Sequence, residues 1–198
     1  MKQLSANAGT SNRPVLLLLL LVLLAGLFLC TVRYAFQDEV AYLNDALRIS
    51  TCLGEGRWIG DETVGFHGFL FKLPAALLFL VTGPSIFVAT LTNIGFAVLA
   101  VYLSYLICFH FFRNRWWAVG GGFLVFSAVF FLRALATFLR DSASIFALLL
   151  VVLLVLKKKN KWLIGFAFLL LLDAKETVFF SLLPGFIAWV LYDEYLKH

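Results

Sequence analysis

Hydrophobic residues occur in this chain as long unbroken runs, and a single polar interval separates the first run from the others. The runs cover residues 15–32, 85–112, 116–132, 142–156, 162–172 and 178–192. Because they are long and show no alternation with period two, they predict membrane-spanning helices rather than the strands of a barrel. We therefore expect an all-α integral membrane protein with about six transmembrane helices.

The polar interval, residues 33–83, predicts two further helices that lie on the membrane surface. One helix is expected over residues 37–52. From the residue before it, apolar side chains recur at spacings of four, three and four and form one stripe: Phe36, Val40, Leu43 and Leu47. By the same spacing Asp38, Tyr42 and Asp45 lie on the opposite face. We expect the stripe to face lipid and the carboxylates to face solvent.

The second apolar part of this interval, residues 66–81, decides the topology. If it spans the membrane, the basic segments 113–115 and 157–161 lie outside. If it is a surface helix, both lie inside together with Lys2 and Arg13, as the positive-inside rule favours. This choice makes residues 1–14 a cytoplasmic tail, 33–83 an external loop and 84–192 five further spans. The loop then faces the periplasm, exterior or lumen, and a bacterial or archaeal plasma membrane is favoured.

Composition agrees with a multi-pass membrane protein. Hydrophobic residues make up 63% of the 198 residues, more than a soluble domain of this size can bury. The formal charge of +5 lies mainly at the ends of the runs, so it indicates topology and no nucleic-acid partner. The three cysteines, Cys30, Cys52 and Cys108, have neither metal-ligand spacing nor the pattern of a disulfide framework.

Ionisable residues gather at the external ends of the predicted spans. The run 162–172 is short, so the turn after it is expected within the headgroup region, where Asp173 or Glu176 can neutralise Lys175. Candidate bases or metal ligands are Asp38, Glu39, Asp45 and His67, and candidate phosphate-binding cations are Lys72, Arg133, Arg140 and Lys175. Carboxylates near such cations suggest transfer of a group from a phospholipid-linked donor.

The order of these features resembles the GT-C glycosyltransferases, which include protein O-mannosyltransferases and the aminoarabinose transferase of lipid A. The resemblance rests on Asp38-Glu39-x-x-Tyr42 after the first span, His67-Gly68-Phe69-Leu70 at the second surface helix, Arg140-Asp141 after the third span, and Ala174-Lys175 after the fifth. It covers nearly the whole chain. The family commonly has proline within the histidine motif, whereas this chain has its proline at Pro74.

The resemblance implies a role for each matching residue. Asp38, with Glu39 beside it, corresponds to the carboxylate that is the catalytic base or binds a divalent metal ion. Lys175, Arg140 and Lys72, in falling order, are the candidates that hold the phosphate of a polyprenyl-phosphate sugar. Three further residues are expected at the site: Tyr42, His67 and Asp141.

Two functions follow from the resemblance. The first is a glycosyltransferase that moves a sugar from a lipid-phosphate donor to an acceptor on the external face. The second is a non-catalytic module of the same fold that binds a lipid-linked sugar or scaffolds a larger membrane enzyme. Family members usually have more spans, so we expect an N-terminal module, with a partner membrane subunit as one source of the missing spans.

Overall fold

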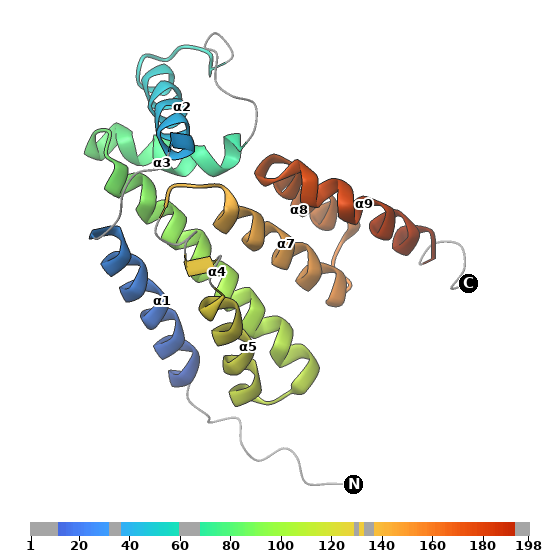
Figure 1. The fold of residues 1–198 in the computed structure, drawn as a ribbon. Coiled ribbons are helices and arrows are strands. Elements are labelled where there is room, and N and C mark those ends of the chain that lie inside the picture. The colour runs from blue at the N-terminus through green and yellow to red at the C-terminus, as the bar shows by residue number, and fades with distance from the viewer. Residues whose placement is uncertain (1–11, 32–36, 60–67, 129–130, 133–136, 193–198) are drawn as a thin grey trace, which may run out of the picture.

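All regular structure in the described part of the chain is helical. The computed structural model describes residues 12–31, 37–59, 68–128, 131–132 and 137–192, and these contain no strand. Within these ranges the structure gives eight helices: α1 (Arg13–Thr31), α2 (Gln37–Gly54), α3 (Phe69–Thr82), α4 (Ile86–Phe112), α5 (Arg115–Ser127), α7 (Asp141–Leu156), α8 (Lys161–Ala174) and α9 (Glu176–Leu191) (Figure 1). The predicted all-α architecture is confirmed.

Each predicted apolar run coincides with one helix, and α5 is the main difference in length. It ends at Ser127, earlier than the predicted residue 132, because the backbone of Ala128 turns to an extended conformation. Asparagine side chains start two of the helices. Asn114 accepts hydrogen bonds from the first backbone N–H groups of α5, and Asn160 does so for α8.

Two helices, α1 and α4, are long and apolar enough to cross a membrane. The helices α7 and α9 are also apolar but have 16 residues each. At the usual rise this is about 24 Å, less than the hydrocarbon core of about 30 Å. The length and composition of two helices therefore match membrane spans.

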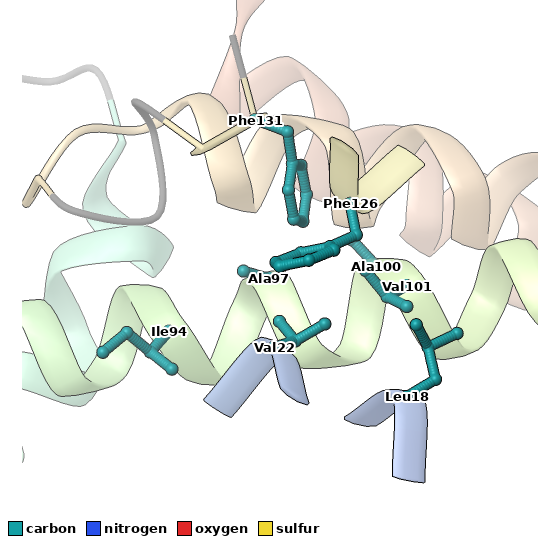
Figure 2. Packing of buried hydrophobic residues seen from close by; sticks show 8 residues of the cluster. All are labelled: Leu18, Val22, Ile94, Ala97, Ala100, Val101, Phe126 and Phe131. Carbon is teal, nitrogen blue, oxygen red and sulfur yellow. The ribbon is translucent and has the colours of Figure 1, made fainter. Parts of the chain in front are cut away.

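Helix α4 is the centre of the packing, because α1, α5 and α7 all pack against it. The cluster at this centre contains Leu18, Val22, Ile94, Ala97, Ala100, Val101, Phe126 and Phe131. Figure 2 shows Leu18 and Val22 of α1 beside the alanines of α4, with Phe126 on the other side of them. Small residues on α4 let its neighbours approach closely.

Glycines have the same effect at two of these contacts. A Cβ atom on Gly26 of α1 would lie 2.9 Å from Ile94 Cγ1, and one on Gly122 of α5 would lie 2.8 Å from Leu18 Cδ2. Neither distance is available to a real side chain. Close helix contacts through small residues are typical of helices that pack within a membrane.

Helices α2 and α3 lie together at one end of the other helices, and α3 runs crosswise to α4 and α7 (Figure 1). Beneath them, Phe71, Ala75 and Phe79 of α3 pack with residues of α4, α7 and α8, namely Ala89, Ala143 and Ala174. At the far side of the molecule α9 packs on α8, with the rings of Phe168 and Phe186 4.1 Å apart. The candidate site is at the end that carries α2 and α3.

Candidate functional site

The first element of the candidate site is α2, and it docks through a face that combines small and apolar side chains with one buried carboxylate. Its buried residues include Glu39, Ala46 and Ile49. Val40 and Leu47 of the predicted stripe are 45% and 39% exposed. Their exposure leaves the predicted stripe available to face lipid, which stays a prediction. Of the carboxylates expected in solvent, Asp38 is exposed, whereas Asp45 is paired with Lys72 of α3.

Glu39 is the buried carboxylate of the described α2 residues, and it holds the backbone that leads into α7. Its side chain is 0% exposed, and Oε1 accepts a hydrogen bond of 2.5 Å from the backbone N–H of Phe138. The neighbouring Thr137 carbonyl accepts from the Asn93 side chain of α4. Two helices thus fix the same short segment, and Arg140 follows it directly.

Asp45 and Lys72 form the second polar connection, this time between α2 and α3. Lys72 Nζ lies 2.8 Å from Asp45 Oδ2, and the Lys72 side chain is 0% exposed. The same ammonium group lies 5.8 Å from the centre of the Tyr42 ring, and that ring packs edge-on against Phe71. Lys72 is therefore enclosed within the α2–α3 contact.

The turn between α8 and α9 is tied to the start of α3 by Asp173. The Asp173 carbonyl accepts from Gly68 N–H at 2.9 Å, and its carboxylate Oδ1 accepts from Phe69 N–H at 3.0 Å. The N–H groups at the start of a helix have no acceptor within that helix. Asp173 supplies the acceptors at the start of α3. Gly68 has φ +75°, a left-handed conformation that glycine adopts without strain.

Two ion pairs join the start of α7 to the same α8–α9 turn. Arg140 NH1 lies 3.1 Å from Glu176 Oε2, and Lys175 Nζ lies 2.8 Å from Asp141 Oδ1. The four side chains are 24% to 44% exposed. Lys175 thus pairs with a carboxylate from another helix and not, in the contacts described, with the neighbouring Asp173 or Glu176 that the sequence suggested.

Tyr42 marks the place where these elements meet. Burial raises the pKa of its hydroxyl, the positive charge of Arg140 opposes this shift, and the negative charges of Asp38, Asp141 and Glu176 add to it. The hydroxyl therefore lies within electrostatic reach of groups from α2, α7 and α9. Of these groups, Asp38 is the exposed carboxylate on α2.

The structure separates the two carboxylates that the sequence places side by side. Asp38 faces outward at the start of α2, whereas Glu39 is buried on the Phe138 backbone. This arrangement fits a base or ligand at Asp38 and a positioning role at Glu39, and the pair does not form one shared ligand set. Within the described residues no three His, Cys, Asp or Glu side chains are grouped to hold a metal ion. His67 lies outside the described residues, as does Arg133.

The cations also separate into two kinds. Lys72 is enclosed with Asp45, so the phosphate-binding role predicted for it does not fit the structure. Arg140 and Lys175 remain partly exposed in one layer with Asp38 and Tyr42. A guanidinium has five N–H donors, so Arg140 can bind Glu176 and still donate to an anion.

Sequence reasoning missed the polar residues that assemble the site. Asn93 lies in the long apolar helix α4, and its amide holds Thr137. An amide inside an apolar run is costly unless it has a partner, and this was the available signal.

No protein-family model, no curated protein and no solved structure matches the chain.

Proposed function

We propose that this chain is a multi-pass membrane protein whose α2–α3 end faces the exterior or the lumen. The supporting observations are the apolar surfaces and the place of α3. Leu17, Leu24 and Phe28 of α1 are 66%, 54% and 66% exposed, as side chains that face lipid would be. The crosswise direction of α3 suits a helix on the membrane surface, and it leaves the basic turns at the ends of α4 and α7 on the opposite side.

The proposed activity is a glycosyltransferase of the GT-C type that takes its sugar from a polyprenyl-phosphate donor. The observation that carries this proposal is the contrast at the start of α2. Asp38 stays exposed while Glu39 and Asp45 hold the helix in place. The charges of Asp38 and Arg140 both influence the pKa of the Tyr42 hydroxyl. An available carboxylate thus lies in one layer with partly exposed cations.

In the proposed reaction Asp38 accepts the proton of an acceptor hydroxyl. The acceptor oxygen forms a bond to the anomeric carbon of the sugar, and the bond from that carbon to the phosphate oxygen breaks. The products are the glycoside and polyprenyl phosphate. Arg140 and Lys175 stabilise the negative charge that develops on the departing phosphate. A divalent metal ion at Asp38 would perform the same neutralisation of the phosphate.

The test is sugar transfer by the purified full chain from a set of radiolabelled polyprenyl-phosphate hexoses. Asp38→Asn is expected to lower turnover by about 10²-fold or more, the usual contribution of a general base. Donor binding should persist, because the phosphate ligands are unchanged. The matched control is Glu55→Gln, an exposed carboxylate of α2's flank whose partner is Arg57. Equal turnover in Asp38→Asn and wild type would contradict the proposal.

A second candidate function is a non-catalytic module that binds the lipid-linked sugar for a larger enzyme or a partner membrane subunit. The pairing of Arg140 and Lys175 with carboxylates favours it, because part of their charge is already neutralised. Saturable donor binding without turnover, in wild type and Asp38→Asn alike, is the result that selects this function.

A further inference from the structure

A separate cavity lies at the end of the molecule opposite α2 and α3, between α1, α4 and α5. Its volume is about 300 Å³, at the lower end of the range for ligand sites. One wall consists of Val15, Leu16 and Leu19 of α1. The other wall and the mouth consist of Tyr102, Tyr105, Leu106, Phe109, Asn12 and Arg115. The cavity thus has an apolar body and polar groups at one end.

The aromatic wall is ordered by the helix itself. The rings of Tyr102 and Tyr105 are stacked with centres 6.3 Å apart, and those of Tyr105 and Phe109 are stacked at 6.1 Å. Tyr105 belongs to a buried cluster with Val15 of α1 and Ala118 of α5, so contacts with both neighbouring helices hold its ring in place. A supported row of flat rings opposite leucine side chains fits an extended hydrocarbon chain.

The charge around the mouth has one sign. Arg13 begins α1, and Arg113 and Arg115 connect α4 with α5. The sequence contains no Asp or Glu in residues 1–37 or 63–140, so none of the helices that form the cavity carries an acidic residue. A ligand with an anionic head and an apolar tail is complementary to this surface.

The exposed aromatic residues place the mouth at a membrane interface. Trp116 and Trp117 follow Arg115 directly and are 72% and 68% exposed. Tryptophans in such positions are typical of the headgroup level of a membrane. Arg115 would then lie at the depth of lipid phosphates, and the α1 wall would extend toward the acyl chains.

From these observations we propose that the cavity binds one anionic phospholipid of the inner leaflet, with its phosphate at Arg115 and an acyl chain between α1 and the aromatic wall. This proposal depends on the membrane insertion proposed above and not on sugar transfer. Failure of lipid binding therefore leaves sugar transfer to be tested by itself, and failure of sugar transfer leaves lipid binding to be tested by itself.

The test is native mass spectrometry of the delipidated full chain, titrated with dioleoyl-phosphatidylglycerol or with dioleoyl-phosphatidylcholine. The wild type should bind one phosphatidylglycerol in preference to phosphatidylcholine. Arg115→Gln should weaken this binding about five-fold or more, the effect of one basic side chain at an anionic interface. Leu16→Trp fills the cavity from an exposed position, so it should weaken binding of the lipid while the chain stays folded.

Lys159→Gln is the matched control, because it removes one exposed positive charge from the α7–α8 turn and leaves the cavity unchanged. Its affinity for phosphatidylglycerol should equal that of the wild type. The proposal is overturned by equal affinity for the two lipids, or by unchanged binding in both Arg115→Gln and Leu16→Trp. Displacement of the lipid by millimolar glycerol phosphate would also overturn it, because the site would then bind a soluble phosphate.

Discussion

At the scale of residues, the adjacent carboxylates Asp38 and Glu39 have opposite environments. Neighbouring positions on a helix point about 100° apart, so one of the two can be buried while the other is exposed. Which of them is buried depends on the Phe138 N–H, 99 positions away in the chain. No local pattern contains that information, and the prediction therefore assigned both residues to the catalytic or metal site.

The separation predicts different effects on stability. Glu39→Ala leaves the buried Phe138 N–H without its acceptor and is expected to cost about 1–3 kcal/mol in the free energy of unfolding. Asp38→Ala, at an exposed position, should change it by less than about 0.5 kcal/mol. Thermal unfolding of the two variants in the same detergent measures the difference. Equal losses would show that Glu39 is not the residue that anchors α2.

The buried pair of Lys72 and Asp45 leads to a second prediction. Lys72→Met leaves the partly buried Asp45 carboxylate without its ammonium partner, and removal of one partner of a buried pair costs about 3–5 kcal/mol. The double variant Lys72→Met/Asp45→Leu should recover most of this loss, because no charge is then left in the contact. The same unfolding measurement tests both. A Lys72→Met protein as stable as the wild type would contradict a structural role.

At the scale of elements, the position of the helices could be predicted from apolar runs, but the packed face of α2 could not. The prediction assigned the apolar stripe to lipid and the carboxylates to solvent, and it did not identify the side chains that contact the other helices. In the structure the partners of α2 are an ammonium group and a backbone N–H, from Lys72 and Phe138. Because these partners satisfy Glu39 and Asp45, both carboxylates can lie in the contact beside Ala46 and Ile49, while Val40 stays exposed.

The contact of α4 with α5 allows a test at this scale with two adjacent glycines. A Cβ atom on Gly121 would collide with the side chain of Cys108, whereas one on Gly120 would meet nothing within 4 Å. Gly121→Ala should therefore separate the two helices and lower the unfolding temperature. Gly120→Ala should be neutral or raise stability by about 0.5–1 kcal/mol, because alanine favours the helix. A lower stability for Gly120→Ala than for Gly121→Ala would contradict the described packing.

At the scale of the whole molecule, the sequence predicts that ionisable residues collect at one end, and the structure brings α2, α3, α7 and the α8–α9 turn together there. The location was predictable because charges occur where apolar runs end. The pairing was not, because Arg140 with Glu176 and Lys175 with Asp141 are pairs between different helices. Crossing of the membrane by all six apolar helices remains a prediction that needs its own measurement.

Site-specific cysteine labelling tests the central claim, that the chain spans a membrane with α2 and α3 on the outer side and the basic turns inside. The parent carries Cys30→Ser, Cys52→Ala and Cys108→Ala and should take up no label. Single cysteines are then introduced as Glu55→Cys beside α2, Trp116→Cys at the start of α5 and Lys159→Cys in the α7–α8 turn.

A membrane-impermeant maleimide added to intact cells should label Glu55→Cys alone, and permeabilised cells should label all three variants. Labelling of both Trp116→Cys and Lys159→Cys in intact cells, together with Glu55→Cys, would mean that the segment of α3 crosses the membrane. Labelling of Lys159→Cys in intact cells, or recovery of the chain in the soluble fraction, would contradict the account.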